Sequence, residues 1–314
     1  MKLNDKRGVV RPPAVAGAFY PEARAELDSL IHSSFLHRLG PGTYPNNLKN
    51  VKGNEKRLEG VVECLIVPHA GYIYSGPVAA HSYLRIREIF FSSPSNENRA
   101  AKLSVIIFGP NHYGIGSGIA ASPSEFWQTP YGDVAIDSVF TKTLVKTPAI
   151  IDIDFLAHSR EHSIEVQIPF LQYVSAGISS FSFVPISMML QDYETSMQVA
   201  SIIESAIKSC LQKDPNRNFL VLGSSDLTHY EPRLKASKND AKLLEEVDKL
   251  DISGFYRVLE RNNISACGYG PIAVTMASAK AFGKKRGLLL KYSTSGDVSG
   301  DESSVVGYSA VHFQ

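Results

Sequence analysis

The 314-residue chain has few cysteines, no long apolar run and no excess of charge of either sign. Its cysteines (Cys64, Cys210 and Cys267) form no CxxC pair and no disulfide framework, which favours a reducing compartment. No apolar stretch approaches the roughly 18 residues that a membrane-spanning helix needs. Lys plus Arg number 32 against 31 Asp plus Glu, so no strong field attracts nucleic acid or anionic lipid. The amino-terminal segment has no signal-peptide apolar region, so we expect a cytoplasmic protein without nucleic-acid or membrane partners.

What is present is enough apolar material for a buried core. Hydrophobic residues make up 44% of the chain, and strand-like runs alternate with helical patterns. This order predicts an α/β fold with a central mixed, largely parallel sheet flanked by helices. We expect one domain over residues 1–314. Residues 39–60 and 91–102 are rich in Asn, Ser, Gly, Pro and charge, so we expect them to be surface loop insertions.

Three histidines follow predicted central strands. His69 comes after LIVP, His112 after VIIFGPN and His229 after FLVLGSSDLT. In open α/β sheets ligands bind beyond the carboxyl ends of the strands, so these imidazoles are expected to converge there. Imidazole serves as a metal ligand or as an acid–base group. Each histidine taken alone is more simply a loop residue bonded to backbone; the shared placement favours a common site.

Cys267 lies in SACGYGPI, a glycine-flanked turn that leads into a predicted helix. A helix amino terminus lowers the pKa of a thiol and favours thiolate, which binds metals. A small buried residue under a tight turn is the competing interpretation. Cys64 and Cys210 fall inside a predicted strand and a predicted helix, which indicates core positions.

Other patterns give weaker hypotheses. His158, Glu161 and His162 match the H-x-x-E-H pattern of zinc proteases, but the residues before His158 look like strand or turn. We therefore expect His162 to line the same pocket as the three strand-end histidines. Asp226 is expected to orient His229 as an acid–base pair, and Tyr72 is expected to line the pocket wall. The segment GIGSGIA lacks the G-x-G-x-x-G spacing of a dinucleotide site.

Several motifs together resemble the Memo family: VPHAGYIYSGPVAAHSY, FGPNHYG, FWQTPYGDV, EHSIEVQIPF, GSSDLTHY, CGYGPI and SGDVSGDESSVVGYSA. The resemblance covers nearly the whole chain. It implies a fold similar to the class III extradiol dioxygenases of the LigB type. It also implies metal ligands at His69, His112 and Cys267, with His229 placed like the dioxygenase acid–base histidine.

One departure separates this sequence from the dioxygenases. Their iron is held by two histidines and a carboxylate, whereas the third position here is Cys267, so dioxygenase activity does not follow from the fold. The resemblance implies a transition metal, first Fe(II), with copper as an alternative and zinc as a third option, and redox or oxygenase-like chemistry. Whether the protein is an enzyme stays open.

The alternative is a non-enzymatic binding module that takes a peptide or small ligand in the same cleft. The family is also described as recognising phosphotyrosine peptides in animals, but a phosphate pocket needs Arg or Lys, and the motif loops are poor in both. A hydrolase built on His158, Glu161 and His162 is a third hypothesis, which the helix assignment over residues 156–170 decides. Substrate and oligomeric state stay open.

Overall fold

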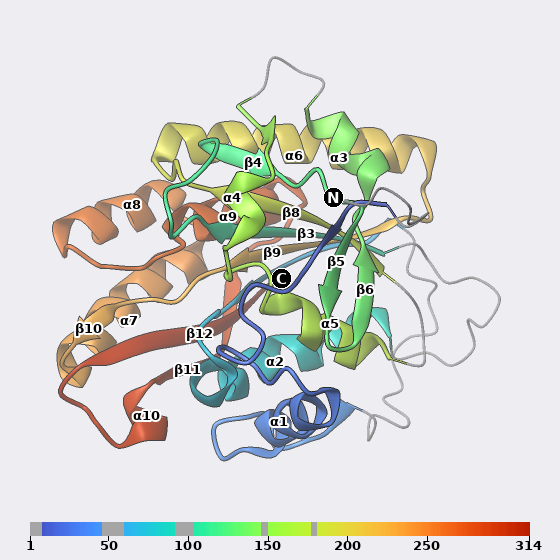
Figure 1. Cartoon of the computed structure of the whole chain (residues 1–314). Coiled ribbons are helices and arrows are strands. Elements are labelled where there is room, and N and C mark those ends of the chain that lie inside the picture. Colours follow the sequence, from blue (N-terminus) through green and yellow to red (C-terminus); the bar gives the residue numbers. More distant parts are fainter. Residues whose placement is uncertain (1–7, 46–59, 92–102, 146–149, 177–180) are drawn as a thin grey trace.

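The structure, a computed structural model, describes residues 8–45, 60–91, 103–145, 150–176 and 181–314 (Figure 1). Most of the two predicted insertions, 39–60 and 91–102, lies outside these residues. No helix of the described ranges combines the length and the apolar character needed to cross a bilayer.

Helices and strands alternate along most of the chain. The strands are β1 (Val10–Arg11), β2 (Val62–Val67), β3 (Leu103–Pro110), β4 (Ile119–Ala121), β5 (Phe126–Thr129), β6 (Gly132–Ala135), β7 (Asp152–Ile153), β8 (Phe181–Met188), β9 (Asn218–Ser224), β10 (His229–Glu231), β11 (Gly287–Thr294) and β12 (Val305–Phe313). The helices are α1 (Arg24–Leu36), α2 (Tyr72–Phe90), α3 (Ser138–Leu144), α4 (Leu156–Ser159), α5 (Gln167–Ser175), α6 (Tyr193–Lys213), α7 (Arg233–Lys249), α8 (Ile252–Arg261), α9 (Tyr269–Ala281) and α10 (Gly296–Ser299).

The central sheet has the strand order β10-β12-β2-β9-β3-β8-β4-β7, with β11 paired to β12. Its middle strands β2, β9, β3 and β8 are parallel, and β12 and β4 join them antiparallel on either side. The predicted fold class, an α/β fold with a mixed and largely parallel central sheet, is confirmed. Near the end of the chain, β11 pairs with β12 in the antiparallel direction.

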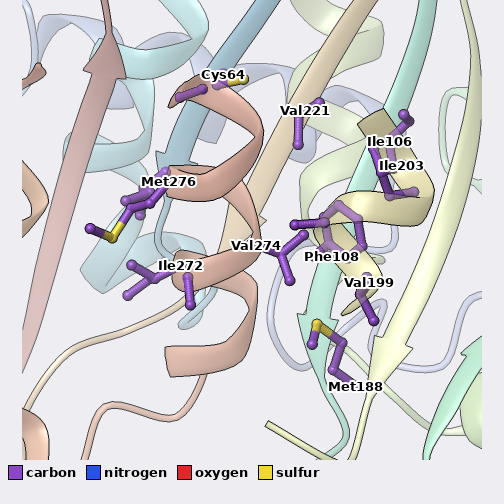
Figure 2. Close-up of a cluster of buried hydrophobic side chains, with 14 of the residues drawn as sticks. Cys64, Ile106, Phe108, Met188, Val199, Ile203, Val221, Ile272, Val274 and Met276 are labelled. Atoms are coloured by element: carbon purple, nitrogen blue, oxygen red, sulfur yellow. The ribbon is translucent and has the colours of Figure 1, made fainter. Parts of the chain in front are cut away.

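Alternation along the middle strands divides the core into two layers. Cys64 and Ile66 of β2 face a cluster formed with α3, α6, α7, α8 and α9, whereas Leu65 and Val67 face α1, α2 and α5. In Figure 2, Val274 of α9 points toward Phe108 of β3 within the first of these layers. Helices on both faces explain why these strands are almost continuously apolar.

The amino-terminal segment is anchored by a buried ion pair. Arg11 of β1 contacts Glu165 at 2.6 Å, and each side chain is 1% exposed. Arg11 also donates to the carbonyl oxygens of His158 and Glu161. A buried pair of this kind is stable only when its remaining donors and acceptors are satisfied, as they are here. The contacts fix the loop between α4 and α5, which the site uses.

Candidate metal centre

The carboxyl ends of the parallel strands bring three distant residues together. His69 follows β2, His112 follows β3, and Cys267 lies in the turn before α9, which packs against β2, β3 and β9. One ligand atom from each of the three residues lies within 4.8 Å of the others. The three side chains that the sequence predicts as metal ligands therefore share one position, which can hold a metal ion.

His69 is held in one tautomer by its neighbours. Its Nδ1 lies 3.0 Å from Oγ of Ser224, and that hydroxyl donates its proton to the carbonyl of Ser163 at 2.6 Å. Ser224 Oγ therefore accepts, and Nδ1 of His69 carries the hydrogen. Burial, together with the neighbouring His112 and His162, holds the pKa of His69 well below its ordinary value. Its neutral ring presents Nε2 to Sγ of Cys267 at 3.1 Å.

His112 is more exposed, and Glu161 fixes its orientation. Glu161 Oε1 accepts from Nδ1 of His112 at 2.9 Å, and Oε2 accepts from its backbone N–H at 2.7 Å. Burial opposes ionisation of Glu161, but its hydrogen bonds with the side chain of His112 and the backbone of Ser163 prevail and lower the pKa to about 2. The carboxylate thus holds Nδ1 and leaves Nε2 of His112 for the shared position, an arrangement common among metal-binding histidines.

Cys267 can approach β9 because glycine follows it. A side chain on Gly268 would overlap the carbonyl oxygen of Ser224. The predicted lowering of the thiol pKa is wrong: burial and the nearby carboxylate of Asp226 raise the pKa of Cys267. The effect of the helix terminus is outweighed because α9 begins at Tyr269, beyond the cysteine. Without a cation beside it the sulfur stays a thiol, whereas a bound metal ion deprotonates a coordinating thiol.

His229 approaches Cys267 and Asp226, but the predicted orientation of its ring by Asp226 is wrong. Nδ1 of His229 lies 2.7 Å from the carbonyl oxygen of Leu227 and 2.9 Å from that of Ser265. Since both partners only accept, Nδ1 carries the hydrogen and Nε2 keeps its lone pair.

Asp226 instead supports the first histidine. Its Oδ1 accepts the backbone N–H of His69 at 2.8 Å. Burial raises the pKa of Asp226 to about 6, although hydrogen bonds from the backbone N–H groups of His69 and Ala70 oppose that rise. Asp226, His229 and Cys267 also place one ligand atom each within 4.8 Å of one another.

The two remaining pocket predictions have different outcomes. The ring of His162 stacks on that of His112, with centroids 4.5 Å apart, and lies 4.4 Å from the ring of Phe19. Burial lowers the pKa of His162 to about 4, so the ring is neutral. Tyr72 does not line the cleft: it is buried, and its hydroxyl donates to the carbonyl of Val166.

The H-x-x-E-H pattern does not form a protease site. His158 belongs to the short helix α4, whereas Glu161 and His162 lie in the turn before α5. His158 is fully buried, and its Nε2 lies 3.0 Å from the carbonyl oxygen of Ala120. Burial lowers the pKa of His158 to about 3. The helix that would align the two histidines is absent from this segment.

Comparison with known proteins shows the family of the chain. A sequence model of the Memo family, described as Memo-like protein, matches residues 11–312. The chain belongs to the Memo family. A MEMO1 family protein of Methanopyrus kandleri is 45% identical over 304 residues, covering 97% of this chain and 99% of that protein. A MEMO1 family protein of Methanococcus maripaludis is 43% identical over 302 residues, covering 96% of this chain and 98% of its own length.

Among solved structures, an uncharacterized protein of Escherichia coli K12 is similar with a TM-score of 0.46 and 12% identity. The match covers 80% of this chain and 99% of that chain.

The residues that support His69, His112 and Cys267 through hydrogen bonds are not evident from the sequence. In the sequence, Ser224 is marked only by its position near Asp226, and Ser265 only by its position near Cys267. Glu161 stood out for a zinc-protease pattern rather than as the partner of His112. Gln167, which donates to Ser224 Oγ at 2.8 Å, carries no sequence signal of its own.

Proposed function

We propose that this Memo family protein binds a transition metal through His69, His112 and Cys267 and is a metal-dependent oxidoreductase. Fe(II) is the first choice, with copper as the alternative and zinc as a third option. The observation that carries the proposal is the meeting of two histidine nitrogens and one cysteine sulfur from three separate strand ends. Each histidine has its other nitrogen held by a hydrogen bond, so the cluster is preorganised.

The donor set fits such an ion. Both imidazoles present Nε2, and neutral imidazole with thiolate selects iron, copper or zinc over magnesium or calcium. When bound, iron or copper supplies Lewis acidity together with one-electron redox chemistry.

The protein's own residues contribute orientation and proton transfer. Ser224 and Glu161 hold His69 and His112, and Asp226 fixes the backbone of His69. His229 keeps an unshared lone pair on Nε2, so it can take a proton from a bound ligand and return it. In that role the backbone carbonyls of Leu227 and Ser265, rather than a carboxylate, keep the ring in position.

The test is anaerobic metal uptake. Wild-type protein loaded with Fe(II) and passed over a desalting column is expected to retain iron, and His69→Ala is expected to lose the ion at this position. His37→Ala, which changes a histidine outside the cluster, is the matched control. Absence of retained Fe(II), copper and zinc in the wild type, or equal retention by His69→Ala, would overturn the proposal.

A second candidate function is a binding module, favoured by apolar side chains beside the cleft. Ile73, Tyr74 and Tyr113 are exposed on segments that follow His69 and His112. Tyr230, next to His229, is 77% exposed and has a φ of 58°, a strained conformation for a tyrosine. This candidate predicts that His229→Ala changes ligand affinity although the protein catalyses no turnover.

A further inference from the structure

Cys267 belongs to two groups of ligand atoms, not one. It lies within 4.8 Å of His69 and His112, and equally within 4.8 Å of Asp226 and His229. We propose that the Cys267 thiolate bridges two transition-metal ions, the first held by His69 and His112 and the second by Asp226 and His229. This inference rests on the proposed function, because it takes the first ion as given, and it assigns Nε2 of His229 to the second ion in place of proton transfer.

In the group of Asp226, His229 and Cys267, some ligand atoms have lone pairs that no described hydrogen bond uses. Nε2 of His229 makes no hydrogen bond within the described residues, and its Nδ1 is occupied by carbonyl oxygens. Asp226 accepts the backbone N–H of His69 through Oδ1, and its carboxylate also accepts the backbone N–H of Ala70. A carboxylate offers about four lone-pair positions, so these two bonds leave room for a metal ion. A buried carboxylate beside a sulfur and an imidazole is also better stabilised by a cation than by apolar neighbours.

A third group in the cleft looks similar but has no free carboxylate. His112, Glu161 and His162 also approach within 4.8 Å. Glu161, however, accepts the backbone N–H groups of His112, His162 and Ser163 as well as Nδ1 of His112. Its oxygens are thus used by the protein, and we interpret this group as a support for His112. Asp226 differs from Glu161 because its carboxylate accepts fewer hydrogen bonds from the protein.

Sulfur chemistry permits the bridge. A thiolate has several lone pairs, and a metal–sulfur bond is about 2.3 Å long, so two ions on one sulfur are at most about 4.6 Å apart. Two-metal sites in proteins commonly have separations of about 3.5–4 Å. Cys267 and Asp226 together supply two negative charges, which partly neutralise two divalent ions.

The test is titration of the metal-free full-length chain with Co(II) under anaerobic conditions. Stoichiometry is measured by elemental analysis, and electron paramagnetic resonance reports coupling between ions. The wild type is expected to bind two Co(II) per chain, with spin intensity below that of two isolated ions. His229→Ala and the milder Asp226→Asn are each expected to bind one uncoupled Co(II), and His37→Ala is expected to match the wild type.

The possible results separate this inference from the proposed function. One Co(II) per wild-type chain, unchanged in His229→Ala and lost in His69→Ala, overturns the second ion and keeps the first. Two uncoupled ions overturn the bridge. Two ions retained in both His229→Ala and Asp226→Asn overturn the assigned ligands. No bound metal overturns the proposed function itself.

Discussion

The ring nitrogens of the histidines near the two ends of β2 differ in their hydrogen bonds. Toward the start of the strand, His312 of β12 has both ring nitrogens engaged, Nε2 with Glu63 at 2.9 Å and Nδ1 with Arg85 at 3.5 Å. Lys284 completes the group by pairing with Glu63 at 2.8 Å. Beyond the end of the strand, His69 has Nδ1 engaged and directs Nε2 at Cys267.

The hydrogen bonds of the ring nitrogens distinguish a structural histidine from one able to bind a ligand. In the group around His312, both ring nitrogens are used by hydrogen bonds. This group stabilises the fold, and its histidine has no free nitrogen for a metal ion. The cleft histidines His69, His112 and His229 each have one nitrogen fixed by the protein and the other directed into the cluster. Substitutions in the two groups are therefore expected to have different effects on stability and on metal affinity.

The largest expected effect is the loss of stability in Glu63→Ala, near the start of β2. Glu63→Ala leaves Lys284 and His312 without their carboxylate in a largely buried position, which costs about 2–4 kcal/mol of the free energy of unfolding. Urea denaturation measures this loss. Metal uptake by the folded variant is expected to equal that of the wild type; a large loss of affinity would show that the two ends are not separate.

In the cleft, Glu161→Gln is expected to weaken metal affinity. The amide keeps the approximate shape but accepts more weakly from Nδ1 of His112, and such supporting partners are worth about 10–100-fold in affinity. Competition with a chelator measures the change. Glu63→Gln is the matched control and is expected to leave the affinity unaltered. Equal affinities for Glu161→Gln and wild type would contradict the role assigned to Glu161.

A pH dependence follows from His158, which is buried like His312. Its pKa is about 3 in the folded chain against an ordinary 6.5, so only the unfolded chain binds a proton between these values. The folded state is therefore favoured above pH 6.5 and loses up to about 1.4 kcal/mol for each pH unit below it. In urea denaturation of metal-free protein from pH 7 to 4, His158→Gln is expected to show a shallower decline. An identical decline in both proteins would contradict the assignment.

The smallest expected effect is that of Ser224→Ala. It removes the acceptor of the His69 Nδ1–H and frees the ring to change tautomer, so we expect metal affinity to fall about tenfold. Ser187→Ala changes a buried serine whose hydroxyl has no partner among the described residues, and it is the control. If both variants match the wild type in a chelator competition, Ser224 does not support metal binding by His69.

Much of the fold could be predicted from the sequence. The apolar runs of β2, β3 and β9 are long and the helical patterns between them are regular, so their order indicates a parallel arrangement. The placement of His69 and His112 then follows from the rule that parallel strands end at one edge of a sheet. Cys267 depended more on the family resemblance, because its turn precedes a helix rather than following a strand.

Most of the supporting hydrogen bonds could not be predicted, because they join positions far apart in the chain or use backbone carbonyls. The partner of His229 was expected to be Asp226, three residues away, but backbone carbonyls took that place. Backbone acceptors carry no side-chain signal, and burial, which raises the pKa of Cys267, depends on the whole packed cleft. Tyr72 was misplaced because an aromatic residue beside a motif serves the core as readily as a pocket.

We expect His69, His112 and Cys267 to hold a transition metal at the carboxyl ends of the parallel strands. Anomalous diffraction from crystals of the Fe(II)-loaded protein, measured on both sides of the iron edge, tests it most directly. The account predicts an iron peak about 2.0–2.4 Å from Nε2 of His69, Nε2 of His112 and Sγ of Cys267. Iron found only on other side chains, or a loaded crystal without a peak in this cleft, would contradict it.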